Sequence, residues 1–526
     1  MKTANLAEFF KQTARTDRGC LYIQAGALEK QWVSYYTLYQ QAESRAKQLA
    51  ALSLPPRFIA VLWMDQSPAS MAAFISVILA NGIPVPLHPA SKGEEAAAII
   101  RKLEAEIVLL SEVQVQQIQR IASEGSEEGS YLGPMYWLEG ESGEKLDASI
   151  LSAAGSRRPR VRQYSPPSQT AVIFMSSGST GVPKGILLTE KNLLSNVEAI
   201  QAYLHITEMD HILLTKSMGY CSTITGEWLL ALLTGANLQM AVGFAHPLQI
   251  VGLIRDHHSS FMCTVPSTLI PLLKLKKWNI DALISLKKLI IVGGQMPAEL
   301  LVQLRRLLSW IEIMPCYGLT EASPRVSYLP GHSLALKPNS VGIPIQGVEI
   351  TIYLNGQPNP PGEIGEVIVN GPNLMLGYYN DPIRSEKVLA AYGLRTADIG
   401  YLDEEGYLFI TGRLDNALNV AGHSIYPESI EQVISNHPWI QEVAVTGIAD
   451  QVWGQLPIAY VVPTESGAAE PSLLEELYQY CQQHLSSVQR PKEIIQIQQL
   501  PKRVNGKLDR RRLQFIVKEQ SDASTE

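Results

Sequence analysis

Between residues 1 and 330, short apolar runs alternate with longer stretches of helical periodicity, and this alternation restricts the possible folds most strongly. Continuous apolar runs of this kind are typical of parallel strands that are buried on both faces. They lie at residues 58–64, 107–110, 171–175 and 289–292. Residues 68–81 have a helical pattern, and a second one, with apolar residues at 193, 197 and 200, begins behind a capping residue, Thr189. We therefore expect an α/β, doubly wound architecture.

The pattern changes near residue 340, where short alternating runs are separated by Gly and Pro. Such spacing predicts a small β-rich subdomain. After Gly412 and Arg413, mixed helical and strand patterns predict a compact α+β domain. The expected division is a large N-terminal domain, residues 1–412, and a small mobile C-terminal domain, residues 413–526. Residues 123–168 are rich in Ser, Gly, Glu, Pro and Arg, which indicates a surface loop or linker.

Charge and composition exclude several classes of protein. The formal net charge of −7 provides no extended positive field, so nucleic acid is not an expected partner. The sequence contains no apolar run of about 18 residues, so no membrane span is expected. The five cysteines are scattered and form no CxxC pair, which favours reduced thiols in a cytoplasmic protein.

The apolar run at residues 171–175 leads into a loop of hydroxyl and glycine residues. The loop reads Ser176-Ser177-Gly178-Ser179-Thr180-Gly181-Val182-Pro183-Lys184-Gly185. Glycines let the backbone approach a ligand, N–H and O–H groups donate to oxyanions, and a lysine offsets charge, so this composition suits a triphosphate. A flexible Gly/Ser turn has the same composition, so the spacing has to decide. Lys184 is followed by Gly185 and not by a hydroxyl residue, which excludes a P-loop NTPase, and the Gly-x-Gly-x-x-Gly spacing of dinucleotide sites is absent.

The loop closely resembles the phosphate loop of the adenylate-forming superfamily. That superfamily contains acyl-CoA synthetases, the adenylation domains of nonribosomal peptide synthetases, and luciferases. The resemblance assigns nucleotide binding to Ser177, Gly178, Ser179, Thr180 and Gly181, and a catalytic role to Lys184. It also implies ATP and Mg²⁺ as cofactors.

A second motif, Tyr317-Gly318-Leu319-Thr320-Glu321, resembles the Tyr-Gly-x-Thr-Glu of the same superfamily. There the tyrosine ring packs on adenine, the threonine meets phosphate, and the glutamate helps to hold magnesium. The resemblance therefore makes Tyr317 a nucleotide contact, Thr320 a catalytic residue, and Glu321 both a catalytic residue and the metal ligand. An aromatic face, a hydroxyl and a carboxylate on one short segment suit a magnesium nucleotide.

Three further motifs follow in the order that the superfamily has. Asp398 lies in a Thr-Ala-Asp that resembles its Thr-Gly-Asp, where the aspartate accepts the ribose hydroxyls. Arg413 and Asp415 match its domain junction, which implies a ribose contact and a hinge. Lys507, in a C-terminal Gly-Lys, would be the catalytic lysine that bridges the substrate carboxylate and the α-phosphate. Because these motifs span residues 176 to 507, the resemblance covers nearly the whole chain.

The substrate pocket is expected to contain Tyr220, Cys221, Ser222, Gly293 and Gly318, with Gly294 beside the nucleotide. Amino-acid-activating members hold the α-ammonium with an aspartate at the position of Ser222. Without a carboxylate there, a buried ammonium would have no partner. A hydroxy, keto, aryl or short aliphatic acid is therefore favoured over an ordinary α-amino acid. Gly422 resembles the start of the loop that guides the incoming thiol.

The resemblance implies a free-standing enzyme that activates a carboxylic acid with ATP and transfers the acyl group to a phosphopantetheine thiol. The acceptor is either CoA or a separate carrier protein. A non-thiol or luciferase-like oxidative enzyme would share the fold and the first step. A non-catalytic nucleotide-binding scaffold is a further alternative, and it predicts the loss of Lys507, Glu321 or Asp398, all of which are present.

Overall fold

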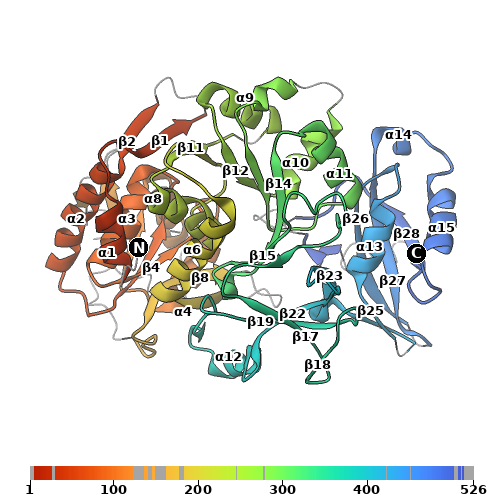
Figure 1. The fold of residues 1–526 in the computed structure, drawn as a ribbon. Coiled ribbons are helices and arrows are strands. Elements are labelled where there is room, and N and C mark those ends of the chain that lie inside the picture. Colours follow the sequence, from red (N-terminus) through yellow and green to blue (C-terminus); the bar gives the residue numbers. More distant parts are fainter. Residues whose placement is uncertain are drawn as a thin grey trace.

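The computed structural model describes residues 5–25, 30–123, 135–139, 145–147, 162–176, 183–244, 246–275, 279–421, 423–450, 452–502, 508–510 and 512–513. Helices and sheets are layered over most of the chain, with the N-terminal elements at one side and the last elements at the other (Figure 1). The α/β architecture with a large N-terminal part and a small C-terminal part is confirmed.

The largest sheet has a parallel centre with antiparallel strands at both edges, in the order β16-β15-β14-β13-β12-β10-β11-β1-β2. Its strands are β1 (Gly19–Gln24), β2 (Gln31–Ser34), β10 (His211–Leu214), β11 (Asn237–Val242), β12 (Phe261–Thr264), β13 (Lys288–Ile291), β14 (Glu312–Gly318), β15 (Arg325–Tyr328) and β16 (Ile343–Pro344). Strands β10 to β13 are almost entirely buried, as expected for parallel strands covered on both faces. Ligands of open α/β sheets bind beyond the carboxyl ends of such strands.

A second sheet lies near the N-terminal helices, in the order β4-β3-β5-β6-β7 (Figure 1). Its strands are β3 (Ile59–Trp63), β4 (Ile83–Pro86), β5 (Ile107–Leu110), β6 (Met135–Glu139) and β7 (Lys145–Asp147). The expectation of a loop over residues 123–168 was wrong for β6 and β7, because β6 extends this sheet in parallel with β5 and β7 returns against β6. Strands β6 and β7 are difficult to predict from the sequence because they are short and lie between residues typical of loops.

The third sheet corrects the expectation of a parallel strand at residues 171–175. Here β8 (Thr170–Ser176) pairs antiparallel with β9 (Lys184–Thr189), which pairs antiparallel with β20 (Gly377–Tyr378). The connection from Ser176 to Lys184 is shorter than the dozen or more residues that a parallel crossover needs. Since an apolar run has the same pattern in either orientation, this spacing decides the pairing. Lys184 therefore opens the strand that returns from the phosphate loop.

The β-rich subdomain expected after residue 340 is a sheet in the order β18-β17-β19-β22-β21, with β23 beside β22. Its strands are β17 (Glu349–Leu354), β18 (Gln357–Pro358), β19 (Gly365–Asn370), β21 (Leu389–Ala390), β22 (Gly393–Leu402) and β23 (Leu408–Arg413). The 3₁₀ turn η6 (Leu414–Asn416) leads from β23 into the last part of the chain.

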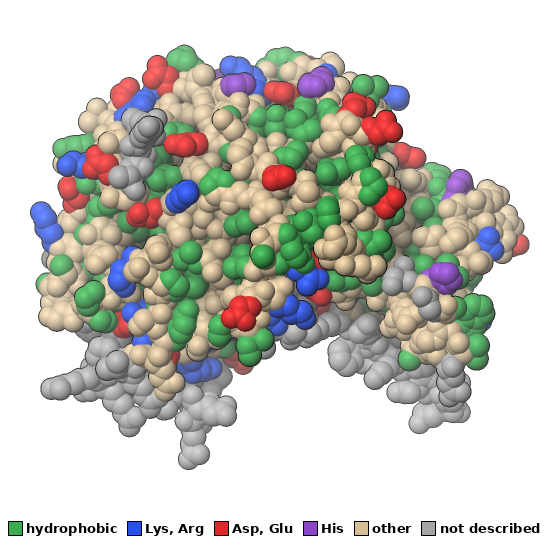
Figure 2. Space-filling view, turned by 60° about the horizontal axis from the view of Figure 1, so that its bottom comes forward, with side chains coloured by type: hydrophobic (Ala, Val, Ile, Leu, Met, Phe, Trp, Pro, Cys, Tyr) green, Lys and Arg blue, Asp and Glu red, His purple; other side chains and the backbone are tan. Residues whose placement is uncertain are grey.

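The last part has its own sheet and its own apolar core, with Ile430, Ile434, Val461 and Leu477 fully buried in it. It consists of β24 (Leu418–Val420), β25 (His423–Ile425), α13 (Pro427–Ser435), β26 (Ile440–Asp450), β27 (Gly454–Pro463), α14 (Glu465–Ala468), α15 (Leu473–His484) and β28 (Glu493–Gln496). In the space-filling view, a notch separates this smaller lobe from the main body (Figure 2).

The remaining helices cover the sheets. They are α1 (Leu6–Thr13), α2 (Tyr35–Ala51), α3 (Pro68–Leu79), α4 (Gly93–Leu103), α5 (Glu112–Ser123), α6 (Glu190–Leu204), α7 (Cys221–Thr223), the π-helix η3 (Ile224–Leu229), α8 (Leu230–Thr234), α9 (Pro247–His257), α10 (Pro266–Lys274), η4 (Ile280–Leu283), α11 (Ala298–Leu307), η5 (Thr320–Ala322) and α12 (Pro382–Val388). Helix α3 is apolar all round and buried, and its Phe74 packs edge-on against Trp228 of η3. Within the described residues, no helix is long and apolar enough to cross a bilayer.

Helix α6 begins where the sequence predicts it. The hydroxyl of Thr189 accepts a hydrogen bond from the backbone N–H of Asn192 at 2.9 Å. The side chain of Asn192 in turn accepts from the N–H of Thr189 at 2.8 Å, which completes a capping box.

We expect Thr189→Ala to lower the free energy of unfolding by about 1 kcal/mol, because the substitution leaves a helix N–H without its acceptor. Lys191 is exposed in the first turn of α6, and Lys191→Ala should change the free energy of unfolding by less than about 0.5 kcal/mol. Denaturant titration of both variants and of the parent measures these changes in the free energy of unfolding. Equal stability of Thr189→Ala and the parent would show that the cap does not contribute.

Candidate functional site

Tyr317, Asp398 and Arg413 meet although they come from two different sheets. The Tyr317 hydroxyl donates to Oδ2 of Asp398, and Nη1 of Arg413 lies 3.0 Å from Oδ1 of the same carboxylate. Asp398 and Arg413 are paired residues of β22 and β23, so the ladder itself sets their separation. The hydroxyl of Thr396 accepts from the N–H of Asp398 at 3.0 Å and fixes the turn before it. The three residues predicted to contact the nucleoside are thus brought together.

Ala397, the residue before Asp398, stands where the Thr-Gly-Asp motif of the superfamily has a glycine. Ala397 has a φ of +59°, in the left-handed region that favours glycine. A residue with a Cβ is held there at a cost of roughly 1–2 kcal/mol. The backbone therefore takes the conformation that a glycine would give it, and Asp398 keeps its orientation.

Lys184 and Glu321 lie on either side of Tyr378. The Tyr378 hydroxyl donates to Oε1 of Glu321 at 3.0 Å, and Nζ of Lys184 lies 5.4 Å from the centroid of the Tyr378 ring. Pairing of β20 with β9 places Tyr378 there. Partial burial lowers the pKa of Lys184, and Arg384 acts in the same direction while Glu321 opposes it. Sequence reasoning missed Tyr378, because no motif marks it and only the sheet pairing brings it to Glu321.

Thr320 opens the short turn η5 directly after Gly318 and Leu319. The backbone N–H of Met375 donates to the Glu321 carbonyl at 2.9 Å and holds this turn. A Cβ on Gly318 would lie 1.9 Å from the Pro324 carbonyl oxygen, so the close approach of β14 and β15 requires a glycine there. Gly318 thereby lets Thr320 and Glu321 follow directly on Tyr317.

The predicted pocket segment starts just after β10 and runs into α7 and η3. The Tyr220 ring lies 5.3 Å from that of His88, and burial raises the Tyr220 pKa to about 12. Cys221 is buried, whereas Ser222 is half-buried. Gly293 and Gly294 are exposed in the loop that follows β13.

A cluster of buried and half-buried polar side chains beside this segment was not predicted. We name it the inner polar cluster; its members are Tyr203, Lys216, Glu227, Cys263, Cys316 and Arg325. Nζ of Lys216 lies 2.8 Å from Oε2 of Glu227 and donates to Sγ of Cys263 at 3.1 Å. Nη1 of Arg325 donates to Sγ of Cys316 at 3.0 Å and to the Tyr203 hydroxyl. A carboxylate within the apolar run of η3 was the signal in the sequence that could have indicated this cluster.

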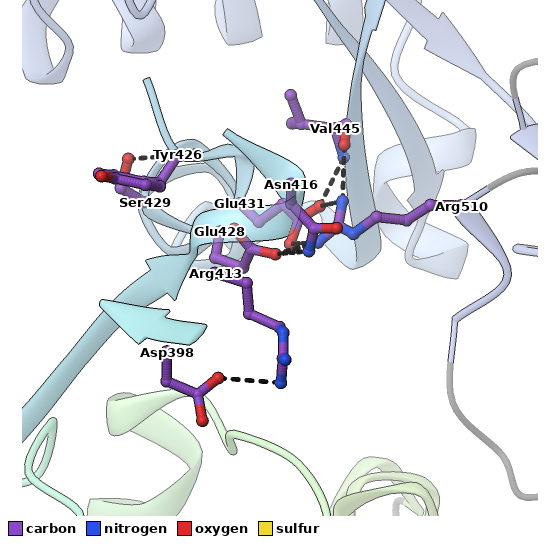
Figure 3. A network of polar contacts seen from close by, with 9 residues as sticks. All are labelled: Asp398, Arg413, Asn416, Tyr426, Glu428, Ser429, Glu431, Val445 and Arg510. Carbon is purple, nitrogen blue, oxygen red and sulfur yellow. Dashed lines mark hydrogen bonds and ion pairs between the residues drawn. The ribbon is translucent and has the colours of Figure 1, made fainter. Parts of the chain in front are cut away.

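The junction between the two parts is held by a second polar network, which Figure 3 shows beside the Asp398–Arg413 pair. Arg510 pairs with Glu431 of α13 through both guanidinium N–H₂ groups, at 2.5 and 2.7 Å. It also lies 3.1 Å from Oε1 of Glu428, which accepts from Asn416 of η6. Burial raises the pKa of Glu431, and Arg510 opposes that shift. The segment that follows the predicted catalytic lysine is therefore fixed to α13.

The predicted hinge residue, Asp415, lies in η6, between Arg413 and Asn416 of this junction. Several other predicted site residues lie outside the described residues: Ser177, Gly178, Ser179, Thr180, Gly181, Gly422 and Lys507.

The residues in place fit a magnesium nucleotide. Among the described residues, no group of three or more His, Cys, Asp and Glu side chains is arranged to hold a metal ion. Mg²⁺ in nucleotide sites typically needs only one or two carboxylates, since phosphates and water complete its shell. Glu321, held by Tyr378 and near Lys184, suits that requirement.

Comparison with known proteins identifies the family of the chain. Residues 9–379 match the AMP-binding enzyme family, and residues 429–507 match the AMP-binding enzyme C-terminal domain. The chain is 30% identical over 374 residues to a 2-succinylbenzoate–CoA ligase of Bacillus velezensis, covering 71% of this chain and 74% of the relative. It is 30% identical over 372 residues to a long-chain-fatty-acid–CoA ligase of Bacillus subtilis, covering 70% of this chain and 65% of the relative.

The fold resembles that of o-succinylbenzoate coenzyme A synthetase from Bacillus subtilis, solved in complex with ATP and a magnesium ion. The TM-score is 0.78 at 24% identity, over 96% of this chain and 99% of the other. Together with the family matches, this confirms the recognition of the superfamily. The chain belongs to the AMP-binding enzyme family and is an acid–thiol ligase of the adenylate-forming type.

Proposed function

We propose that this enzyme converts a carboxylic acid and ATP to an acyl-adenylate and pyrophosphate, and then transfers the acyl group to the thiol of CoA. The meeting of Tyr317, Asp398 and Arg413 at one place, with Lys184 and Glu321 around Tyr378, carries the proposal. These residues supply an aromatic face, a carboxylate for ribose, a cation for phosphate and a carboxylate for Mg²⁺.

In the first step a carboxylate oxygen of the acid attacks the α-phosphorus of ATP, and the bond to the bridging oxygen of pyrophosphate breaks. Both reactants are anions, so the protein has to position them and offset their charge. We assign the phosphate contacts to Lys184 and to the loop at residues 177–181. Bound at Glu321, Mg²⁺ would neutralise charge on the phosphates. We assign to Lys507 the bridge between the substrate carboxylate and the α-phosphate.

In the second step a thiolate attacks the acyl carbonyl, a thioester forms, and AMP leaves with the electron pair of the broken anhydride bond. One lysine cannot occupy the carboxylate position while a thiol approaches it. We therefore propose that the small domain, residues 413–526, turns about Asp415 between the two steps, withdraws Lys507 and presents the loop at Gly422.

The names of the relatives favour CoA over a carrier protein as the acceptor, since both are CoA ligases. ATP–pyrophosphate exchange across a panel of acids tests the first step. Incubation of the best acid with ATP and either CoA or a phosphopantetheinylated carrier protein tests the second step. Acylation of the carrier protein without acyl-CoA formation would contradict the choice of acceptor.

We expect Lys507→Ala to reduce ATP–pyrophosphate exchange about 100-fold or more, the effect of losing one group that stabilises transition-state charge. Thioester formation from supplied acyl-adenylate should persist, because Lys507 is withdrawn in that step. Lys502→Ala is the matched control: its Nζ pairs with Glu442 at 2.8 Å on the surface of the same part of the chain, and its exchange rate should stay within about threefold of the parent. Normal exchange by Lys507→Ala would refute the role of this lysine.

We expect Tyr378→Phe to raise the Mg²⁺ concentration for half-maximal exchange about tenfold or more, because Glu321 loses the hydroxyl that orients it. Tyr379→Phe is the control, since the Tyr379 hydroxyl donates to the Leu103 carbonyl at 2.9 Å, away from Glu321. That variant should lose stability and keep the Mg²⁺ requirement of the parent. The same Mg²⁺ requirement in both variants would contradict a metal-binding role for Glu321.

A further inference from the structure

Arg510 connects the chain that follows the proposed catalytic lysine to helix α13 (Figure 3). Its Nη2 donates to Oε2 of Glu431 at 2.7 Å and to Oε1 of Glu428 at 3.1 Å. Its Nη1 donates to Oε1 of Glu431 and to the Val445 carbonyl of β26. Both N–H₂ groups therefore have acceptors, and paired contacts of this kind between a guanidinium and carboxylates fix direction as well as distance.

One carboxylate oxygen joins Arg510 to the proposed hinge. Oε1 of Glu428 accepts from Arg510 and also from the side-chain amide of Asn416. Asn416 follows the hinge residue, Asp415, directly in η6. Glu428 lies in the first turn of α13, where the positive end of the helix dipole favours a carboxylate. Two bonds to the same oxygen thus link the hinge to the chain that follows Lys507.

The chain on either side of residues 503–507 is held in place as well. Lys502 and Leu508 form an antiparallel β-bridge, so these two flanking residues lie side by side. Consecutive Cα atoms are about 3.8 Å apart, so the place of Leu508 restricts where the backbone of Lys507 can lie. Arg510, two residues after Leu508, relates this place to α13 and to the hinge.

Helix α13 itself lies close to the strand that leads to the nucleotide site. A Cβ on Gly412, near the end of β23, would lie 2.6 Å from Cβ of Tyr426 and 3.2 Å from Oε2 of Glu428. The backbone beside Arg413, the proposed ribose contact, therefore passes directly against the start of α13, and a glycine permits this approach. Helix α13 has a defined place relative to the nucleotide site, and Arg510 gives the chain after the lysine a defined place relative to α13.

Adenylation requires accurate placement of the lysine charge. The ammonium group of a lysine stands at the end of a long, flexible side chain, so its position depends on how firmly the backbone beneath it is held. A displacement of about 1 Å at a group that acts on the reacting atoms can cost about 100-fold in rate, even when the change that causes it lies elsewhere. A residue that holds the backbone next to the lysine therefore affects the rate without contacting the substrate.

We propose that Arg510 is a positioning residue for adenylation, which fixes the chain after Lys507 to α13 and, through Glu428, to the hinge. Arg510 acts through the lysine and contacts neither the acid nor ATP. Its loss therefore slows the step that uses Lys507 and spares the step in which Lys507 is withdrawn. This inference rests on the role of Lys507 proposed above.

Separate assays of the two steps test the inference. ATP–pyrophosphate exchange with the best acid of the panel reports adenylation, and thioester formation from supplied acyl-adenylate and CoA reports the second step. In Arg510→Gln the kcat of exchange should fall about tenfold or more while the KM for ATP stays within about threefold of the parent, because the lysine acts in the transition state. Thioester formation should stay within about threefold of the parent. Arg510→Lys keeps the charge without the planar fork, so it should restore part of the exchange.

A double variant gives the sharpest comparison. If Arg510 acts through Lys507, then Arg510→Gln should reduce exchange by less than about twofold when Lys507→Ala is already present. A general weakening of the C-terminal part would instead reduce exchange by the same factor in both backgrounds and would slow thioester formation as well. Equal factors in the two backgrounds, in folded enzymes, would overturn the inference.

Arg512→Gln is the matched control. Arg512 is exposed two residues further along the same segment, and its substitution should leave both exchange and thioester formation within about threefold of the parent. A loss of exchange in Arg512→Gln equal to that in Arg510→Gln would contradict a specific role for Arg510.

Thermal unfolding of each variant checks the fold. The N–H of Asp509 donates to the Pro501 carbonyl at 2.8 Å and Leu513 is fully buried, so this part of the chain has contacts that do not need Arg510. If Arg510→Gln does not fold, Glu428→Ala takes its place in the same assays, because it removes the oxygen that the hinge and the arginine share. Glu428→Ala should reduce exchange about threefold or more and spare thioester formation, and normal exchange would overturn the proposed link.

The outcomes also separate this inference from the proposed function. Impaired exchange by Lys507→Ala together with normal exchange by a folded Arg510→Gln would overturn the role of Arg510 and leave the role of the lysine intact. Normal exchange by Lys507→Ala would refute the role of the lysine, and the role of Arg510 with it. No exchange by the parent enzyme with any acid would overturn the proposed adenylation itself.

Discussion

The ion pair between Asp398 and Arg413 connects the parts of this molecule that must act together. It links adjacent strands β22 and β23, and the same carboxylate accepts the hydroxyl of Tyr317 from the largest sheet. Arg413 is the last residue of β23, and the turn η6 with Asp415 follows at once. A change in the register of β22 and β23 would therefore displace the proposed ribose site and the proposed hinge at the same time.

The charged residues around Tyr378 and those of the inner polar cluster differ in burial. Around Tyr378, Lys184 and Glu321 are only partly buried. In the inner polar cluster, Glu227 and Arg325 are buried and Lys216 is half-buried, and the three side chains have partners within the cluster.

Lys184 and Glu321 could be selected from the sequence, because each lies in a short motif whose spacing is fixed by a loop or a turn. The Thr189 cap was predictable for the same local reason. The antiparallel pairing of β8 could not be predicted from its apolar run, because such a run has the same pattern in either strand direction. Tyr378 and Arg510 could not be found in this way, because each acquires its role only from contacts made across the fold.

The polar contacts at the junction indicate which bonds a turn of the small domain could break. Arg510 binds Glu428 and Glu431 of α13 and the Val445 carbonyl of β26, all within the C-terminal part, so these bonds would move with it.

The hydrogen bond from Gln432 to Asn339, at 3.0 Å, crosses between the two parts and is exposed. An exposed hydrogen bond can be exchanged for bonds to water at little net cost, whereas breaking the buried Arg510 pairs would leave charges without partners. The distribution of polar contacts therefore favours rotation of the C-terminal part as a rigid body, with Arg510 keeping the segment after Lys507 fixed to α13 throughout.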